Sequence, residues 1–487
     1  MIRPLLVLAL ALVCGAAQAA DAARPGDLPH NEFGGIIEPP MDWSSYPKPA
    51  KTGKFDGELK HIKTDAFIMK YLMFAPAKLP EKKILGLVLC FHGQGGNETN
   101  MAPPIHESMK AAGLAENYVI IGLKSSGAGW ADADERLVLQ TIDWLKATYP
   151  IDPRRVFVWG MSNGGMMVST FGGKHQDSIA GIVRYCGYPP TAPSAKDPAN
   201  TQTEYYLVHG DADEAVGVDG SRKLRQSLLQ QGYHFVYREM DGLGHVPIIN
   251  NTDVREDVCR WIDGLRHKQV PLQADEDKFL RQFADAKKSA PLFTKPDVWG
   301  ELLRIAGPQA AVVVARAFKS DSATVRENAA TACSKSLFAG DETVDGLIHL
   351  TEDKNAGVRQ AAITALGVAA NWRYEPAQMT LGKLALKKKG DLGERGGATA
   401  LLAAAAARPL LGNFDDDMPT FQALIALMDE DEKTLRETAF APLKVAVKDG
   451  LGYDPTVTAK ERAGAIAKWK QWFTERNKTP GQKTAAK

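Results

Sequence analysis

The sequence predicts an α/β fold, a mostly parallel sheet with helices on both faces, followed by an all-α region. Between residues 66 and 268, short apolar runs alternate with helix-compatible segments, which is typical of a parallel sheet covered on both faces. After residue 297, similar segments recur every 33–41 residues without strand periodicity, which is typical of a two-helix solenoid. A chain of 487 residues also exceeds one ordinary core, so we expect two or more domains.

Residues 1–20 have the pattern of a signal peptide. A basic start at Arg3 precedes an apolar core, Leu5–Val13, that is too short to span a bilayer, and Ala17-Gln18-Ala19 is a suitable cleavage site. We therefore expect export, with a periplasmic or extracellular destination. No later stretch reaches transmembrane length.

The remaining composition is that of a globular protein. Residues 21–65 differ from this globular composition, because their prolines and glycines predict an irregular leader. The net charge of +1 provides no electrostatic case for nucleic acid as a partner. After the signal peptide the chain keeps four cysteines without any C-x-x-C pairing, so metal binding is unsupported. Export would permit their oxidation, but Cys90 and Cys186 lie in apolar strand patterns, and we expect them to be buried.

The predicted elements follow from the apolar pattern. Strands are expected over residues 66–74, 84–91, 118–123, 156–159, 181–185, 205–208 and 234–239. Helices are expected over residues 101–113, 134–149, 166–171, 219–231 and 252–265. In a sheet of this kind, catalytic groups belong on loops at the carboxyl ends of the strands.

The strand over residues 156–159 runs into Gly160-Met161-Ser162-Asn163-Gly164, and a helix follows. Strand, G-x-S-x-G and helix together predict a nucleophile elbow with Ser162 as nucleophile. Glycine at both ends of the motif relieves the collisions of so sharp a turn. The Asn163 N–H, at the start of the helix, would face an oxyanion. The alternative is a glycine-rich turn that happens to contain a serine.

Three further strand ends carry chemical groups. The glycine loop at residues 92–96 predicts a second oxyanion donor, the Gln94 N–H, with His92 shaping the loop. In residues 209–216, Asp211 and Asp213 both qualify as the carboxylate that orients a histidine, although an acidic turn facing solvent is the alternative. The glycine turn at residues 241–245 ends in His245, which completes the order Ser, Asp, His expected of this architecture.

These motifs resemble the α/β-hydrolase fold, and within it the secreted esterases of the polyhydroxybutyrate depolymerase and feruloyl or acetylxylan esterase type. The similar segments are IDPRRV running into GMSNGG, then HGQGG, HGDADEAV and GLGH. The resemblance covers residues 66–268 and implies that Asp213, rather than Asp211, is the catalytic acid. It also implies a substrate with an ester bond, as in polysaccharide or polyester degradation.

The C-terminal part shows a repeated pattern around four arginines. Arg326, Arg359, Arg395 and Arg436 are each followed, three and seven residues later, by a small or apolar residue. The pattern resembles HEAT-type repeats over residues 297–476, after a connector over 269–296 with one short helix and before a disordered tail over 477–487. Such solenoids bind protein partners on a concave face, and a spacer or dimerisation role is equally open.

The sequence therefore predicts an exported serine hydrolase that cleaves carboxylic esters through an acyl-enzyme, without a metal or organic cofactor. Ser162, Asp213 and His245 form the predicted triad, and the backbone N–H groups of Gln94 and Asn163 the oxyanion hole. Trp130 would form a wall for a small-molecule or polymer-linked substrate, or would merely pack a surface loop. The alternatives are a serine peptidase of the same fold and a non-catalytic, solenoid-based binding protein.

Overall fold

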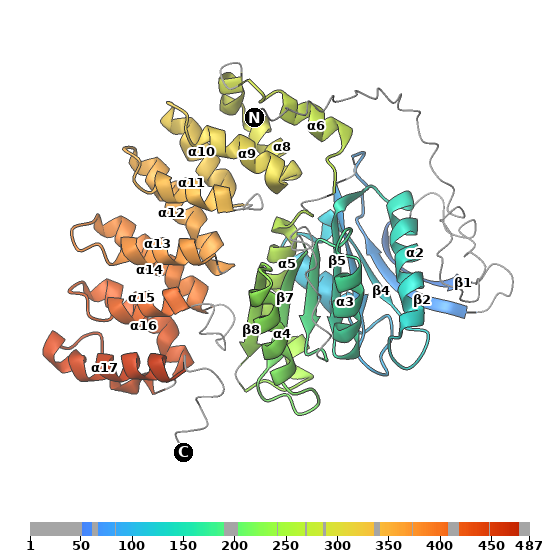
Figure 1. Cartoon of the computed structure of the whole chain (residues 1–487), viewed down its shortest axis with the longest axis horizontal. Helices are drawn as coiled ribbons and strands as arrows, with labels where there is room; N and C mark the ends of the chain where they lie inside the picture. Colours follow the sequence, from blue (N-terminus) through green and yellow to red (C-terminus); the bar gives the residue numbers. More distant parts are fainter. Residues whose placement is uncertain are drawn as a thin grey trace, which may run out of the picture.

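A computed structural model describes most of the chain from residue 51 onward (Figure 1). The described residues are 51–60, 67–82, 84–188, 203–240, 242–267, 270–285, 289–335, 341–372, 374–407, 418–447 and 449–476. The predicted signal peptide, most of the predicted leader and the predicted tail lie outside these residues. In Figure 1 the β-sheet and its covering helices lie on the right of the view, and a stack of helices lies on the left.

The sheet has eight strands in the order β1-β2-β4-β3-β5-β6-β7-β8. Strands β1 and β2 pair antiparallel, as do β2 and β4, and all the other pairs are parallel. The strands are β1 (Gly53–Lys60), β2 (Phe67–Ala75), β3 (Leu85–Phe91), β4 (Tyr118–Leu123), β5 (Ile151–Met161), β6 (Gly181–Tyr185), β7 (Glu204–Gly210) and β8 (Phe235–Met240). This mostly parallel sheet confirms the predicted α/β-hydrolase fold class.

Helices cover both faces of the sheet. Helices α2 (Asp132–Thr148), α3 (Asn163–Lys174) and α4 (Asp219–Gln230) share one hydrophobic core with the strand residues that face them, among them Leu87 and Leu89. Helices α1 (Ala102–Ala111) and α5 (Thr252–Gly264) share the second core, which contains Val88 and Cys90. Successive residues of β3 thus enter opposite cores, which explains why a strand buried on both faces is an unbroken apolar run.

Strand β1 corrects the prediction of an irregular leader over residues 21–65. It forms an antiparallel edge strand beside β2, within a stretch whose KFDGELK pattern alternates apolar and charged residues as a half-exposed strand does. Phe55 lies edge-to-face against Tyr71, with ring centroids 6.5 Å apart. A side chain at Gly57 would collide with the Tyr71 ring, so this glycine marks a close approach between strands rather than a loop.

The C-terminal part is all-helical, as predicted. Its helices are α6 (Ala274–Arg281), α8 (Pro296–Ile305), α9 (Gly307–Ala317), α10 (Ala323–Cys333), α11 (Asp341–Leu350), α12 (Ala356–Asn371), α13 (Glu375–Ala385), α14 (Leu392–Ala407), α15 (Met418–Leu427), α16 (Lys433–Ala446) and α17 (Ala459–Arg476). Helices α10, α12, α14 and α16 pack in sequence as one layer, and α9, α11, α13 and α15 pack as the other. The assignment to HEAT-type repeats stays a prediction.

The four repeated arginines link successive helix pairs. Arg326 contacts Asp353 at 2.6 Å, Arg359 contacts Glu394 at 2.7 Å, and Arg395 contacts Glu430 at 2.8 Å. The fourth, Arg436, donates instead to the Pro455 carbonyl at 2.9 and 2.8 Å. Each of the first three arginines therefore binds an acidic residue of the following helix pair. The repeated arginine in the sequence thus corresponds to a contact between successive helix pairs.

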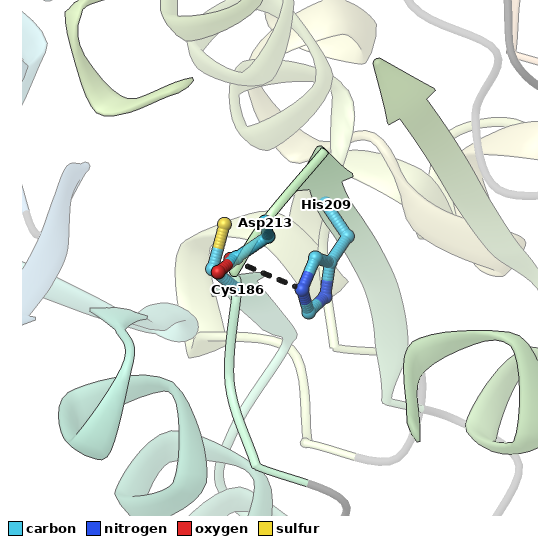
Figure 2. A group of neighbouring side chains, drawn as sticks. All are labelled: Cys186, His209 and Asp213. Atoms are coloured by element: carbon cyan, nitrogen blue, oxygen red, sulfur yellow. Dashed lines mark ion pairs between the residues drawn. The ribbon is translucent and has the colours of Figure 1, made fainter. Parts of the chain in front are cut away.

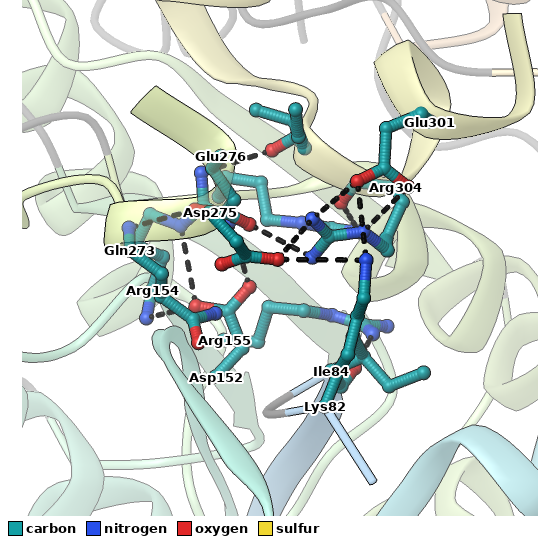
Figure 3. A network of polar contacts seen from close by, with 12 residues as sticks. Lys82, Ile84, Asp152, Arg154, Arg155, Gln273, Asp275, Glu276, Glu301 and Arg304 are labelled. Carbon is teal, nitrogen blue, oxygen red and sulfur yellow. Dashed lines mark hydrogen bonds and ion pairs between the residues drawn. The ribbon is translucent and has the colours of Figure 1, made fainter. Parts of the chain in front are cut away.

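The sheet and the helical part are joined by a buried polar network (Figure 3). Arg154, near the start of β5, contacts Asp152 at 3.0 Å and Glu276 of α6 at 2.6 Å. Arg304 of α8 contacts Glu276 at 3.0 Å, and the Arg154 guanidinium also donates to the Ile305 carbonyl at 3.0 Å. The predicted connector thus contributes helix α6 to a joint at the end of β5 opposite to Ser162.

Two further predictions concern membrane-spanning segments and the cysteines. No helix within the described ranges combines the length and apolar character that crossing a bilayer requires. Cys90, Cys186, Cys259 and Cys333 are all free and buried, which confirms the expectation for Cys90 and Cys186.

Candidate active site

Ser162 lies in the turn between β5 and α3, with φ 57° and ψ −120°. Such a backbone conformation is strained for a residue with a side chain, and strain of this kind is concentrated at functional sites. A side chain at Gly160 would collide with the Gly164 carbonyl, and one at Gly164 would collide with the Phe91 carbonyl. The two glycines therefore allow the turn to close tightly against β3, in the geometry expected of a nucleophile elbow.

Asp213 lies in the turn after β7 and contacts His245. His245 Nδ1 is 2.7 Å from Asp213 Oδ2, and Asp213 Oδ1 accepts hydrogen bonds from the N–H groups of Ala215 at 2.9 Å and Val216 at 2.8 Å. Burial would raise the pKa of Asp213, but the Val216 N–H and the His245 ring outweigh it, so that the pKa is lowered. Asp213 is therefore ionised near neutral pH.

The other carboxylate of this turn has a different partner. Asp211 is exposed, and its Oδ1 accepts a hydrogen bond from the Gly242 N–H at 2.7 Å. Asp211 therefore ties the turn after β7 to the turn that carries His245. Between the two aspartates left open by residue type alone, Asp213 is the one in contact with the histidine.

His245 follows β8 in a glycine turn that crosses the end of β7. A side chain at Gly210 would collide with the Leu243 carbonyl, which shows how closely the two turns pack. Because Nδ1 donates to Asp213, the Nε2 atom is left as the acceptor of the ring. Among the described residues no hydrogen bond joins His245 to Ser162, and such catalytic contacts are often formed only when substrate binds.

The three residues nevertheless lie at the same edge of the sheet, after β5, β7 and β8. The Ser162 N–H donates to the Tyr185 carbonyl at 2.8 Å, and the next residue, Cys186, donates its N–H to the Val208 carbonyl at 2.9 Å. The ends of β5, β6 and β7 are thus hydrogen-bonded in sequence. Cys186 in turn lies beside Asp213, with its Sγ within 4.8 Å of a carboxylate oxygen. The structure therefore brings Asp213 and His245 into contact and holds Ser162 two strands away from Asp213.

The loop after β3 lies next to Ser162, the predicted nucleophile. A Cβ at Gly93 would be 3.4 Å from the Ser162 Cβ and 3.9 Å from its Oγ, so the backbone passes beside the hydroxyl. The following N–H, that of Gln94, has no acceptor among the described residues. The Asn163 N–H opens α3, where a backbone donor has no partner within the helix. Within the described part of the chain, neither predicted oxyanion N–H is therefore bound to a carbonyl oxygen.

Trp130 and His92 shape this loop. Trp130 is buried, its ring N–H donates to the His92 carbonyl at 2.9 Å, and its backbone N–H donates to Asn163 Oδ1 at 2.6 Å. The His92 ring accepts from the Ser125 N–H at 3.1 Å and contacts the Gly93 carbonyl at 2.6 Å. His92 therefore has the expected loop-shaping role. Trp130 holds together the two segments that carry the predicted oxyanion donors, while its role as a substrate wall stays a prediction.

Cys186, His209 and Asp213 form a buried group that could be taken for a metal site (Figure 2). Burial raises the pKa of the Cys186 thiol and lowers that of His209. His209 Nε2 lies 2.8 Å from the Val216 carbonyl, and only a protonated nitrogen is stable against a carbonyl oxygen. With a protonated thiol and a protonated Nε2, the group is better suited to donate hydrogen bonds to Asp213 than to ligate a metal.

His209 and Cys186 were not assigned any role by the sequence patterns. His209 is the residue before the glycine at the end of β7, and Cys186 follows β6 with a φ of 45°. His209 opens the segment HGDADEAV, and its place at the end of a buried apolar strand is the signal that points to a buried histidine beside the acidic turn. No spacing in the sequence indicates that Cys186 lies beside Asp213.

Known proteins are similar in sequence to part of this region. A family model described as phospholipase/carboxylesterase matches residues 123–252, which include Ser162, Asp213 and His245. The protein named "Putative esterase NocK" of Nocardia uniformis subsp. tsuyamanensis is 32% identical over 158 residues, which are 30% of this chain and 44% of that protein. Acyl-protein thioesterase 1 of Neurospora crassa is 28% identical over 30% of this chain and 58% of its own length.

Dipeptidyl peptidase family member 2 of Caenorhabditis elegans is 26% identical over 34% of this chain and 25% of its own length. The chain thus spans less than two thirds of each of these relatives. Among solved structures, a ferulic acid esterase aligns with a TM-score of 0.38 and 15% identity, over 44% of this chain and 98% of that one. The relatives with matching sequences support a hydrolase.

Proposed function

We propose that this protein is a serine hydrolase of carboxylic esters, with Ser162 as nucleophile, His245 as base and Asp213 as the acid that orients it. The observation that carries the proposal is the 2.7 Å contact between His245 Nδ1 and Asp213 Oδ2. It is supported by the strained backbone of Ser162, with φ 57°, at the end of β5 and the same edge of the sheet. A carboxylate that fixes the histidine tautomer leaves Nε2 free to accept the serine proton.

The mechanism follows from these roles. Ser162 Oγ attacks the acyl carbon while its proton moves to His245 Nε2, and the N–H groups of Asn163 and Gln94 hold the oxyanion. The bond to the alcohol then breaks, and His245 gives its proton to the leaving oxygen. A water deprotonated by His245 attacks the acyl-enzyme, and Ser162 regains its proton as the acid leaves. Asp213 stays ionised throughout, in accord with its lowered pKa.

The test is a panel of p-nitrophenyl esters of increasing acyl length, extended to feruloyl, acetylated-sugar and short polyester substrates. We expect Ser162→Ala to lower kcat by at least about a thousandfold. The matched control is Ser169→Ala in α3, the helix that follows Ser162, where Ser169 Oγ donates only to the Gly165 carbonyl at 2.9 Å. Turnover that survives Ser162→Ala, or no turnover of any ester by the wild type, would reject the proposal.

Peptide hydrolysis is the second candidate, because one relative is named as a dipeptidyl peptidase family member. Dipeptidyl p-nitroanilides separate it from ester hydrolysis, since the leaving amine requires stronger protonation by His245 than an alcohol does. If the folded wild type turns over neither substrate class, the remaining candidate is a binding protein that acts through its helical part.

We further propose export through residues 1–20 and a HEAT-type arrangement of the helices after residue 297. Export is tested by N-terminal sequencing of protein recovered outside the cytoplasm, with a start near Ala20 or Asp21 expected. For the repeats, Arg326→Met and Arg395→Met remove equivalent buried ion pairs, whose arginine side chains are 9% and 7% exposed. Similar losses of Tm would support equivalent repeats, and strongly unequal losses would contradict them.

A further inference from the structure

Asp213 is surrounded by more hydrogen-bond donors than a histidine-orienting carboxylate requires. Besides His245 and two backbone N–H groups, a second histidine approaches it, with His209 Nε2 at 3.3 Å from Asp213 Oδ2 (Figure 2). The mechanism above does not use His209. Resting on the proposed function, we propose that His209 is a positioning residue, which holds the Asp213 carboxylate with Oδ2 directed at His245.

The tautomer of His209 follows from its neighbours. Its Nε2 faces two acceptors, the Val216 carbonyl at 2.8 Å and Asp213 Oδ2 at 3.3 Å, so this nitrogen must carry a proton. Its Nδ1 lies 2.7 Å from Ser221 Oγ, and a hydroxyl can donate to an unprotonated ring nitrogen. One neutral tautomer therefore satisfies all three contacts at once.

The neutral state of His209 is favoured by its surroundings. The side chain is fully buried, and burial lowers its pKa, with Arg184 and His245 acting in the same direction. The Val216 carbonyl and Asp213 act in the opposite direction. Because the ring is neutral at neutral pH, it acts on Asp213 as a fixed N–H dipole 3.3 Å from Oδ2 rather than as a second positive charge.

The contacts form a closed loop around the acid. Val216 donates its N–H to Asp213 Oδ1 at 2.8 Å and accepts from His209 through its carbonyl at 2.8 Å. Ser221 of α4 fixes the far side of the ring, while Cys186 closes the group from β6. The two carboxylate oxygens thus have separate partners: Oδ1 accepts from the backbone, and Oδ2 contacts His245 at 2.7 Å and His209 at 3.3 Å. A carboxylate bound in this way cannot rotate without losing several hydrogen bonds at once.

Two substitutions separate positioning from support of the fold. In His209→Gln the terminal amide reaches the position of Nε2 and keeps an N–H for Asp213 and Val216. In His209→Asn the shorter amide matches Nδ1, keeps the contact with Ser221 and loses the donor to Asp213. Both variants bury one neutral amide, so they differ mainly in the two contacts of Nε2, with the Val216 carbonyl and with Asp213.

We expect His209→Asn to lower kcat by about tenfold to a hundredfold with KM changed less than about threefold, and His209→Gln to stay within about fivefold of wild type. A second measurement does not depend on turnover. The His245 Nδ1–H proton, hydrogen-bonded to a carboxylate, gives a far-downfield NMR resonance. It should shift or broaden in His209→Asn and be retained in His209→Gln.

The inference is overturned if His209→Asn leaves both this resonance and kcat unchanged, or if the two variants lose activity equally and in proportion to Tm. If His209→Asn does not fold, Ser221→Ala takes its place. This variant frees His209 from α4 and should displace the same resonance, while an unmoved resonance contradicts the inference. Failure of the proposed function has a different signature, namely esterase activity that is absent from the wild type or retained in Ser162→Ala.

Discussion

Arg154 is the cation that joins the two parts of the chain, and its removal tests how firmly they are joined. Its side chain is 3% exposed and lies between two carboxylates, Asp152 at 2% and Glu276 at 0% exposure. In Arg154→Met, Asp152 would lose its guanidinium partner, and of its two arginines Glu276 would keep only Arg304 at 3.0 Å. The hydrogen bond to the Ile305 carbonyl would also be lost.

The expected cost is large because the remaining charges cannot reach water. Removing one partner of a buried ion pair destabilises a protein by about 3–5 kcal/mol. For a domain of about 150–250 residues, each kcal/mol of destabilisation lowers Tm by about 2–4 °C, so we expect Arg154→Met to lower Tm by about 10 °C. Thermal unfolding followed by circular dichroism at pH 7 measures the shift.

The sign of the pH dependence gives a second test of the same variant. Burial raises the pKa of Glu276, opposed by Arg154, so the folded state binds a proton more readily than the unfolded state. Stability from a carboxylate with a raised pKa falls as pH rises through the interval between its unfolded and folded values. Without Arg154 that interval widens, so the Tm deficit of Arg154→Met should be larger at pH 8 than at pH 5.

The control is Arg281→Met in α6, which removes an exposed ion pair with Asp277 at 2.7 Å. Exposed pairs contribute little to stability, and we expect no measurable change in Tm. If Arg154→Met unfolds at the same temperature as Arg281→Met, or if its deficit does not depend on pH, the buried network does not stabilise the joint.

Three further predictions concern the candidate active site. Asp213→Asn should lower kcat by about a thousandfold or more on the esters of the panel, whereas Asp211→Asn should change it less than about fivefold, because only Asp213 contacts His245. Because the pKa of Asp213 is lowered in the folded state, its carboxylate stabilises the fold above the unfolded-state pKa of about 3.9. This stabilisation is lost as pH falls through the folded-state pKa, so acid unfolding of Asp213→Asn should depend less steeply on pH. Gly164→Ala would place a Cβ against the Phe91 and His92 carbonyls, and we expect a clear loss of Tm together with activity; unchanged kinetics would show that the elbow is looser than described.

Much of the sheet was predictable from the sequence because its strands are buried on both faces. The run over residues 118–123 corresponds to β4 without a shift of either end, and the run over 84–91 differs from β3 by one residue. Edge strand β1 was missed because its signal is a weak alternation, in which charged residues replace half of the apolar ones. Prolines and glycines on its N-terminal side hid the pattern further.

The sequence by itself determined the groups available to the site and the order in which strand ends present them, since each motif is local in the chain. The tertiary structure alone decided which groups meet. It distinguished Asp213 from Asp211 by contact, joined Trp130 to both segments that carry the predicted oxyanion donors, and placed His209 and Cys186 around the same carboxylate. It also brought Glu276 to Arg154 across 122 residues of chain. Such contacts depend on the packing of distant segments, and no local pattern of residues records them.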